Sequence, residues 1–500
     1  MKINRRRFLG YGFASGVVGA FPANVLLAQA VESSRRMPSS IPAVTLSGSD
    51  MAIEGAAVRE LGESLQGLLM LKGDYGYDGA RRLWNAQHDR YPALIVRAAN
   101  AQDVSNAVTF ARERELLVAV KGGGHSFPGH SVADGALMID LGSMNGVLVD
   151  VASRRAKAGG GALLYNLDFA TQRHGLATTT GTVAHTGLGG LTLGGGYGLL
   201  NRKFGLTIDN LVSAQLVTAD GQIRRISADE NDDLFWAIRG GGGNFGIVTE
   251  FEYQLHEAGP VMLGGDILWP IAQAQELLEF YVEYSAGLSD EMYVSPYMAM
   301  TPDGTGVIGM DVCHCGDLAA GEREFAPLRQ FGNPLSDGVR PVPYLTLQTR
   351  HDGVARPGVR SYVKNGMVGE FTQGLIDAML ENFVPAEGVV FSNIYAHAAG
   401  GAVGRVGETE TAWPHRNVAA MIIVAAAWTD PADDERLRQA TRRVFSAIEP
   451  YTGGYYSNVD SDGANVSTNY GPAYDRLVSV KNAYDPMNLF RLNSNVRPTV

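Results

Sequence analysis

The sequence predicts an α+β protein with two regions of different character. In residues 88–259, short apolar runs typical of strands alternate with helical patterns and blocks of glycine, which suits an α+β or α/β region. After Gly259 and Pro260 the composition changes. A length of 500 residues with 45% hydrophobic content allows a large core and more than one domain.

The first region begins with a helical pattern. Apolar residues recur at helical spacing over residues 100–111, and Asn100 suits the N-cap of that helix. A second helix, residues 162–174, should be closed by Gly175. Strands are expected at residues 117–120, 136–141, 147–151 and 250–255.

The second region extends to about Pro450 and mixes long helices with strands. We expect helices at residues 272–286, 371–383 and 433–448. Strands are expected at residues 307–312, 389–396 and 418–427.

Charge and cysteine content exclude several function classes. The net charge of −11 argues against nucleic acid or an anionic membrane surface as a partner. Cys313 and Cys315 lie two apart on an expected strand, at or past the usual disulfide distance, and only His314 is nearby as a zinc ligand. We therefore expect two ordinary buried thiols and no metal site.

Residues 1–30 have the features of an export signal. Residues 5–9 read Arg-Arg-Arg-Phe-Leu, and residues 28–30 read Ala-Gln-Ala, a small-x-small cleavage site. The arginine pair resembles a Tat signal, which implies the Tat export machinery as a partner and a periplasmic or secreted protein. The apolar stretch is interrupted by glycine and proline, so no stable membrane anchor is expected. The alternative is a basic start with no role in export.

A glycine-rich loop indicates an anion site. Residues 121–126 read Lys-Gly-Gly-Gly-His-Ser and follow the expected strand 117–120. Such a loop lets backbone N–H groups approach a pyrophosphate closely, with His125 within reach of the same ligand. The alternative is a tight turn with a structural histidine. Two further glycine blocks, residues 187–198 and 239–249, favour the ligand site.

The last of these blocks contains a Gly-x-Gly-x-x-Gly pattern at Gly241, Gly243 and Gly246. A Rossmann site needs a strand, then the loop, then a helix. Here a helical pattern precedes the glycines and a strand follows them, so we reject NAD as the cofactor.

Together with residues 484–495, which read Tyr-Asp-Pro-Met-Asn-Leu-Phe-Arg-Leu-Asn-Ser-Asn, these blocks resemble the berberine-bridge-enzyme-like branch of the vanillyl-alcohol oxidase / p-cresol methylhydroxylase flavoprotein superfamily. The resemblance covers nearly the whole chain after the first few dozen residues. It implies FAD as cofactor and a discontinuous p-cresol-methylhydroxylase-type FAD-binding domain, formed by residues 31–259 and 451–500. Residues 260–450 would form an α+β substrate domain, an antiparallel sheet covered by helices.

The resemblance also assigns residues to the cofactor. His125 matches the histidine that is bonded to the flavin 8α-methyl carbon. Val183 stands where many members carry a second attachment residue, a cysteine, so a single covalent link is expected. Thr186 matches the position that controls oxygen access, and its small side chain favours an oxidase, although threonine is also an ordinary strand residue. His185 should lie two residues out of place for a second bond and be structural or pocket-lining. The expected contacts besides His125 are Lys121, Gly122, Gly123, Gly124, Ser126, Val183, Thr186, Gly187, Gly190, Gly195, Gly196, Gly246, Val248, Asn493 and Asn495.

Tyr456 and Asn458 match the family's Tyr-x-Asn motif, in which the tyrosine faces the flavin and acts as a base. A free phenol has a pKa of about 10, so a positive neighbour or the flavin would have to lower it. The alternative is a tyrosine that only packs, with its hydroxyl satisfied. Tyr455 is expected on the other face of the same strand.

The expected strand 418–427 has no polar side chain where plant members carry a polar or acidic one. This implies a more apolar substrate pocket and leaves Tyr456 as the base. Tyr395 and His397 share a face of a neighbouring strand and are further polar candidates, with His397 a possible catalytic residue. A histidine within a sheet is more often structural.

The resemblance therefore predicts an exported FAD-dependent oxidase. It would take a proton from a small, aromatic or apolar alcohol or amine while a hydride passes to the flavin, and O2 would be reduced to H2O2. Two alternatives remain open: a dehydrogenase that passes electrons to a quinone or cytochrome, and a flavin-carrying binding protein without turnover.

Overall fold

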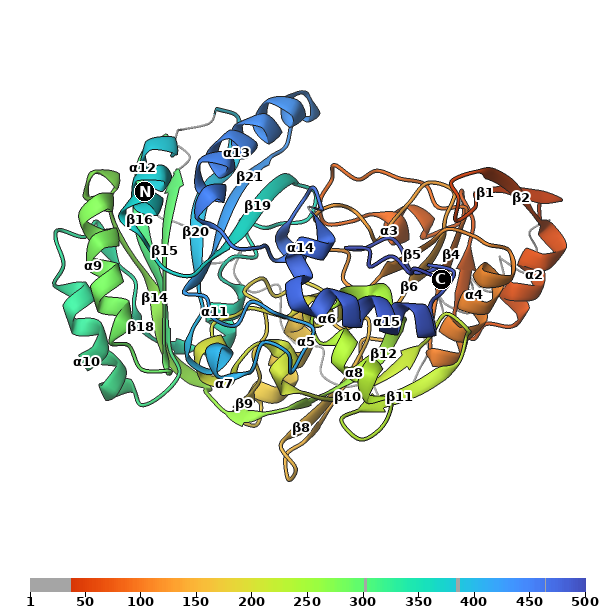
Figure 1. Ribbon diagram of the computed structural model, residues 1–500, viewed down its shortest axis with the longest axis horizontal. Coiled ribbons are helices and arrows are strands. Elements are labelled where there is room, and N and C mark those ends of the chain that lie inside the picture. Colours follow the sequence, from red (N-terminus) through yellow and green to blue (C-terminus); the bar gives the residue numbers. More distant parts are fainter. Residues whose placement is uncertain (1–36, 301–303, 384–386, 464) are drawn as a thin grey trace, which may run out of the picture.

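The computed structural model describes residues 37–300, 304–383, 387–463 and 465–500. The predicted signal, residues 1–30, lies outside these ranges. Within them, none of the helices has the length and apolar character needed to cross a membrane. Three sheets follow one another along the long axis of the molecule, with the largest at one end and the N-terminal strands at the other (Figure 1).

The N-terminal lobe surrounds a four-stranded sheet. Helix α4 (Ala101–Glu113) packs on it through the buried side chains of the predicted helical pattern. The side chain of Asn100 accepts a hydrogen bond from the N–H of Asp103, which confirms Asn100 as the N-cap. The strand order is β3 (Leu68–Met70), β4 (Leu94–Arg97), β6 (Leu137–Asp140) and β5 (Val118–Lys121), the last three parallel. The lobe also contains β1 (Ser40–Val44), β2 (Asp50–Glu54), α2 (Gly55–Glu63) and α3 (Tyr77–Arg81).

The middle sheet has antiparallel neighbours, and in its central strand buried side chains alternate with partly buried ones. Its order is β11 (Ile223–Ser227), β10 (Leu211–Val217), β12 (Ile247–Gln254), β8 (Arg155–Gly159) and β7 (Val147–Asp150). In β12, Phe251 and Tyr253 are buried and the residues between them are not, as the alternation predicts. Helix α5 (Leu164–Gln172) precedes Gly175, whose φ of +65° favours glycine. The remaining elements are β9 (Leu176–Ala177), paired with β13 (His256–Glu257), α6 (Leu188–Gly194), α7 (Asn201–Phe204) and α8 (Asp232–Ile238).

The third sheet has eight strands with antiparallel neighbours. Its order is β17 (Ser336–Asp337), β14 (Val261–Pro270), β16 (Gly306–His314), β15 (Met292–Met300), β20 (Val389–Ala398), β21 (Ala420–Trp428) and β19 (Arg360–Val368), with β18 (Arg340–Pro343) beside β14. The predicted strands at residues 307–312, 389–396 and 418–427 are therefore confirmed within two residues at most of their ends. Cys313, in β16, and Cys315, just beyond it, are free buried thiols.

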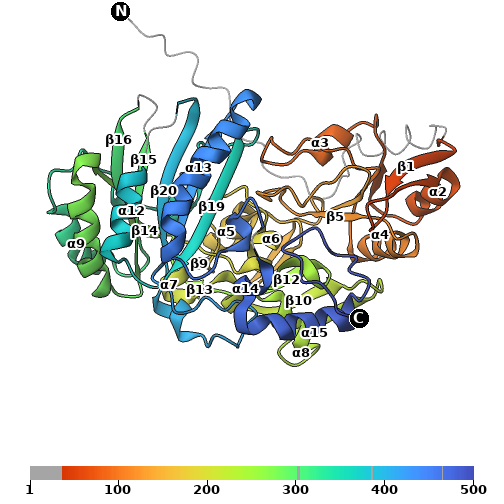
Figure 2. The same cartoon turned by 45° about the horizontal axis from the view of Figure 1, so that its top comes forward.

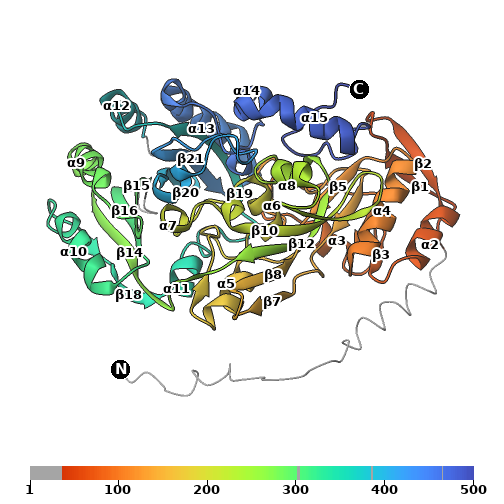
Figure 3. The ribbon, with the colours of Figure 1, turned by 60° about the horizontal axis from the view of Figure 1, so that its bottom comes forward.

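The two faces of this sheet differ. Helices α9 (Ala274–Ala286), α10 (Leu318–Arg329), α12 (Gln373–Asn382) and α13 (Asp434–Ile448) cover one face, which we call the outer face, through an apolar core (Figure 3). The opposite, inner face packs against α11 (Tyr344–Thr349) and, at β21, against side chains that follow the glycine block 187–198. Figure 2 shows α7 and β13 of the middle region below the strands of this sheet. An antiparallel sheet covered by helices is what the sequence predicts.

The C-terminal residues return to the middle sheet. Leu477 and Val480 of α15 (Tyr474–Tyr484), which follows α14 (Val466–Tyr470), join a core with α8 and β12 (Figure 1). The buried Lys481 Nζ donates hydrogen bonds to Asp485 Oδ2 at 2.6 Å and to the Asn244 carbonyl at 2.8 Å. This ion pair therefore ties the C-terminal segment to the glycine block 239–249.

Lys481→Met should lower the free energy of unfolding by ~3–5 kcal/mol, because Asp485 would stay charged in a site from which water is excluded. Thermal and urea denaturation would measure the loss. Arg405→Met is the control: its pair with Asp290 is exposed and should contribute less than ~1 kcal/mol. Equal losses in both variants would contradict a special role for the buried pair.

Candidate functional site

The loop that carries His125 touches the second glycine block directly. β5 ends at Lys121, and a Cβ on Gly123 would overlap the N and Cα atoms of Gly187. Gly124 has a φ of +71°, so this turn also favours glycine. Lys121 Nζ donates to the Ala80 carbonyl at 2.5 Å. The glycines of the motif therefore serve a backbone-to-backbone contact between two loops.

His125 is enclosed by two aromatic rings. Its Nε2 lies 2.6 Å from Nδ1 of His185, and its ring stacks on Trp84 with centroids 4.9 Å apart. Trp84 is itself held by its N–H to the Gly124 carbonyl and by its carbonyl to the Gly358 N–H. Burial, reinforced by the neighbouring His185, lowers the pKa of His125 to about 3, so the imidazole is neutral at physiological pH.

His185 lies against the expected attachment residue. Its side chain contacts His125 directly. Val183, Thr186 and His185 belong to one turn, closed by the Thr186 N–H bond to the Val183 carbonyl at 3.0 Å. The turn brings the His185 ring toward His125, and the expectation that His185 is structural or pocket-lining stays a prediction.

The second glycine block reaches the Tyr-x-Asn motif. The Gly196 N–H donates to Tyr456 Oη at 2.9 Å, and Asn458 Nδ2 donates to the same oxygen at 2.9 Å. Asn458 Nδ2 also lies 3.0 Å from the Gly190 carbonyl, to which it donates. A Cβ on Gly195 would meet Tyr456 Cε2 at 3.5 Å. The phenol oxygen is thus fixed by two donors.

Tyr456 lies in an aromatic cluster, not on a strand. The expected strand is wrong: Tyr455 and Tyr456 occupy an extended loop before a 3-10 helix, Ser457–Val459. Tyr456 is only 3% exposed, with the rings of Tyr197 and Trp413 at 5.6 and 5.3 Å. Burial raises the pKa of Tyr456 to about 12, in spite of the hydrogen bonds from Gly196 and Asn458, which act in the opposite direction.

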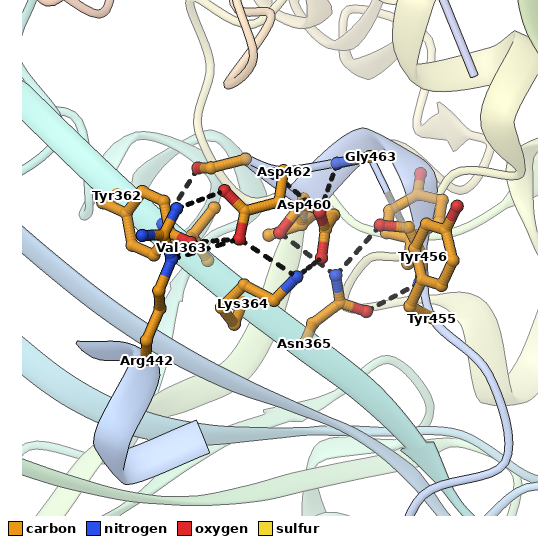
Figure 4. Close-up of polar contacts among 12 residues, drawn as sticks. Tyr362, Val363, Lys364, Asn365, Arg442, Tyr455, Tyr456, Asp460, Asp462 and Gly463 are labelled. Carbon is orange, nitrogen blue, oxygen red and sulfur yellow. Dashed lines mark hydrogen bonds and ion pairs between the residues drawn. The ribbon is translucent and has the colours of Figure 1, made fainter. Parts of the chain in front are cut away.

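Asn365, on β19, clamps the backbone of Tyr456 (Figure 4). Its Oδ1 accepts from the Tyr456 N–H at 2.6 Å, and its Nδ2 donates to the Tyr456 carbonyl at 3.0 Å. The preceding residue, Lys364, forms an ion pair with Asp460 at 2.8 Å. The loop that carries Tyr456 is therefore fastened to the third sheet on one side and to the glycine block on the other. Sequence reasoning missed Asn365, because nothing local marks an asparagine that pairs 91 residues away.

The inner face combines apolar and polar strands. Met421 and Ile423 of β21 pack in the cluster that contains Tyr456, as the apolar strand predicts. On the adjacent β20, Tyr395 and His397 do share this face, with ring centroids 5.6 Å apart. They contact polar residues of β15 and β16 that the sequence did not single out: Tyr293 and Asp311. The structure thus brings His397, the second catalytic candidate, into a polar group that also contains Tyr395, Tyr293 and Asp311.

The C-terminal contacts are held by Asn244. Its Nδ2 donates to the Ser494 carbonyl, and its Oδ1 accepts from the Val496 N–H. This places Asn493 and Asn495 beside the third glycine block, where Gly246 has a φ of +157° and a Cβ would overlap the Val217 carbonyl. Val248, another of the expected cofactor contacts, is buried in β12, and its carbonyl oxygen packs against Gly160.

These loops fit a flavin dinucleotide. Within the described residues, the buried atoms His185 Nε2, Asn493 Oδ1 and Asn495 Oδ1 have no protein partner, and a polar cofactor would supply one. The close loop contact at Gly123 and Gly187 keeps backbone amides free of side chains, as an anionic group requires. Ser126 is engaged instead with the protein, since its Oγ accepts from the His130 N–H.

Comparison with known proteins shows the family to which the chain belongs. Residues 92–227 match the family described as FAD binding domain, and residues 455–497 match the family described as Berberine and berberine like. An FAD-linked oxidoreductase of Dictyostelium discoideum is 33% identical over 443 residues, 88% of this chain and 97% of that protein. (R)-6-hydroxynicotine oxidase of Paenarthrobacter nicotinovorans is 32% identical over 464 residues, 87% of this chain and 97% of that protein.

Solved structures show the same fold. The crystal structure of 6-hydroxy-D-nicotine oxidase from Arthrobacter nicotinovorans is similar with a TM-score of 0.80 and 32% identity, over 87% of this chain and 98% of that one. A berberine bridge enzyme variant, 20% identical over 89% of this chain and 98% of that one with a bound reticuline, has a TM-score of 0.78. The predicted flavoprotein fold is confirmed.

Asn365→Leu should slow reduction of the flavin by substrate at least tenfold, because the Tyr456 N–H and C=O lose their partners and the loop shifts. It should also cost ~1–3 kcal/mol for each backbone group left buried and unpaired. Stopped-flow reduction and thermal denaturation would measure both effects. Asn393→Leu is the matched control, since Asn393 lies on β20 of the same sheet and its Oδ1 is unpaired already. An unchanged reduction rate in Asn365→Leu would show that the clamp does not position Tyr456.

Proposed function

Because this chain belongs to the FAD-linked oxidoreductases that carry a berberine-type C-terminal segment, we propose that it oxidises a small alcohol or amine. When bound, FAD supplies the hydride acceptor for such a reaction. One observation carries the proposal: the phenol oxygen of Tyr456 is fixed by Gly196 and Asn458 where the glycine block meets the inner face.

Tyr456 is suited to donate a hydrogen bond to the substrate. Its oxygen already accepts from two donors, so its own proton is free to be given. With a pKa of about 12, the phenol stays protonated at neutral pH. We therefore assign Tyr456 as the donor that orients the substrate oxygen or nitrogen, a role different from the base inferred from the motif.

The inner face supports a substrate with an apolar body and one polar group. Met421 and Ile423 offer an apolar surface beside Tyr456. Tyr395 and His397, on the next strand, offer polar atoms at one side of that surface. An aromatic or aliphatic alcohol or amine matches this division, whereas an oligosaccharide would need many more hydrogen-bonding side chains.

We propose a single covalent link between His125 and the flavin. A neutral imidazole is the nucleophilic form, and burial keeps His125 in that form. If His185 Nδ1 accepts the proton of His125 Nε2, the free electron pair lies on Nδ1 of His125. Val183 offers no thiol for a second link. The other assigned contacts in residues 121–126, 186–196, 246–248 and 493–495 would hold the cofactor without bonds to carbon.

Oxygen is the proposed electron acceptor, with H2O2 as the product. Thr186 supports this, because its backbone is fixed by hydrogen bonds to Val183 and Leu164 and its small side chain leaves room beside the flavin site.

Export through the Tat machinery is proposed from the basic signal and the cleavage site. Residues 31–259 and 451–500 are proposed as the discontinuous FAD-binding domain, because described residues of both segments pack together in two cores.

Peroxide release tests the proposed function. Purified enzyme in air, given benzyl alcohol, benzylamine or (R)-6-hydroxynicotine, should produce one H2O2 for each substrate oxidised. Thr186→Leu should slow reoxidation by O2 and leave anaerobic reduction unchanged. If the reduced flavin is reoxidised by a quinone analogue but not by O2, the protein is a dehydrogenase. If none of the substrates reduces the flavin, a binding protein is favoured.

His125→Ala should lose all covalent flavin. After acid precipitation the parent protein should stay yellow and fluorescent on a denaturing gel, whereas the variant should release its cofactor into the supernatant. His130→Ala, in the same loop, is the control and should retain the label. Retention of bound flavin by His125→Ala would identify another attachment residue.

Tyr456→Phe should reduce the rate of flavin reduction by ~10²–10³, the typical cost of removing one preorganised donor. Because the raised pKa keeps Tyr456 protonated, its titration should not appear in the pH–rate profile of the parent between about pH 6 and pH 10. A profile that rises through this range and becomes flat in Tyr456→Phe would restore the base role. Tyr455→Phe is the matched control for loss of a phenol hydroxyl.

A further inference from the structure

Four side chains on the inner face form a continuous chain of hydrogen bonds. Tyr395 Oη donates to Asp311 Oδ2 at 2.8 Å, and Tyr293 Oη lies 3.0 Å from Tyr395 Oη. Tyr293 Oη also lies 2.7 Å from Nδ1 of His397. The four residues come from three neighbouring strands, β16, β15 and β20, and Asp311 and Tyr293 are 0% and 1% exposed.

The hydrogen bonds between these four side chains can run in only one donor-to-acceptor direction. A phenol has a single proton, and a carboxylate only accepts. Since Tyr395 gives its proton to Asp311, Tyr293 must donate to Tyr395, and the bond between Tyr293 and His397 must come from Nδ1–H of the histidine. His397 is then the Nδ1-protonated tautomer, and Nε2 has a free electron pair. Within the described residues, that nitrogen has no hydrogen-bond partner.

The far end of the chain is a fixed anion. Asp311 forms an ion pair with Arg350, whose side chain is 13% exposed. Arg350 Nε donates to His351 Nε2 at 3.1 Å. His351 Nε2 also lies 3.7 Å from Asp311 Oδ2. Asp266 faces Asp311 across the β14–β16 register. These charged and titratable groups lie at the Asp311 end, so the chain joins a buried ion pair to an imidazole.

His397 and Tyr456 flank the same ring. The Tyr197 centroid lies 5.5 Å from that of His397 and 5.6 Å from that of Tyr456. Tyr197 itself is a phenol kept protonated, because burial raises its pKa well above the usual range. One side of this cluster therefore offers a proton donor, Tyr456, and the other offers a nitrogen that can accept a proton. A substrate O–H or N–H group that is to be oxidised needs both a hydrogen-bond donor to orient its heteroatom and an acceptor for its proton.

We infer that His397 accepts the substrate proton, and that Tyr293, Tyr395 and Asp311 are positioning residues that fix its tautomer. This rests on the proposed oxidation of an alcohol or amine. The substrate O–H or N–H bond breaks and its proton bonds to Nε2; bound FAD would supply the acceptor for the hydride that leaves the adjacent carbon. The carbon and the heteroatom become doubly bonded, so two electrons leave the substrate with the hydride. The hydrogen-bond chain toward Asp311 keeps the proton on Nδ1, so that Nε2 is the nitrogen that accepts.

NMR of the histidine ring tests the tautomer without turnover. In protein labelled with ¹⁵N-histidine, assigned by comparison with His397→Gln, His397 should show a protonated Nδ1 and an unprotonated Nε2 from about pH 5 to pH 9. Burial lowers the pKa of His397 to about 3, so the ring stays neutral in this range. Tyr293→Phe should abolish the preference. An Nε2-protonated ring in the parent protein would overturn the inference.

Anaerobic reduction by the most reactive of the three substrates named above gives the second readout. His397→Gln should slow reduction by ~10²–10⁴, and Tyr395→Phe, which keeps the Asp311–Arg350 pair intact, by about tenfold. Both should change the solvent deuterium isotope effect on reduction with little change in substrate Kd. A merely structural loss would leave that isotope effect as it is.

Tyr297→Phe is the matched control. Tyr297 stacks on Tyr395 with centroids 6.0 Å apart, on the same face, but lies outside the chain. It should keep the parent rate and isotope effect. If Tyr395→Phe behaves like Tyr297→Phe, the inference is overturned. If no substrate reduces the flavin, the proposed function fails, and the NMR result still decides whether the chain fixes His397.

Discussion

The contact between Gly123 and Gly187 is the constraint on which the rest of the site depends. No Cβ fits between these two backbones, so the loops that carry His125 and His185 can meet only as glycine against glycine. Gly187 also begins the segment in which the Gly196 N–H donates to Tyr456 and the Gly190 carbonyl accepts from Asn458. A side chain at this contact would separate the proposed attachment site and the Tyr-x-Asn motif together, since both are positioned from the same short stretch.

The third sheet supplies two kinds of surface from one set of strands. On its outer face, apolar side chains pack under four helices and give the sheet its stability. On its inner face, Asp311 and Tyr293 are buried and Tyr395 is partly buried, with their hydrogen-bonding groups paired to one another. Paired polar groups cost little when buried, whereas unpaired ones would cost much more. The alternation of a strand thus places stability on one side of the sheet and polar chemistry on the other.

Local patterns in the sequence were sufficient for most elements and for the glycine loops. The helix after Asn100, the alternation in residues 250–255 and the turn at Gly175 depend on near neighbours, so the sequence predicts them. Tyr456 was placed on a strand because alternation cannot distinguish an extended loop. Asn365, Tyr293 and Asp311 were not found, since their roles depend on the register between strands far apart in sequence. His185 required the shape of a turn that no spacing reveals.

The surroundings of His125 have a consequence for the order of maturation. Its ring touches Trp84 and His185, and Trp84 is in turn anchored to Gly358, so the enclosure draws on residues 84 to 358. A ribosome-bound chain that has not yet produced Gly358 cannot complete it. The surroundings of the His125 ring are therefore complete only after residues 84 to 358 have all been synthesised, which assigns their formation to a late stage of chain synthesis.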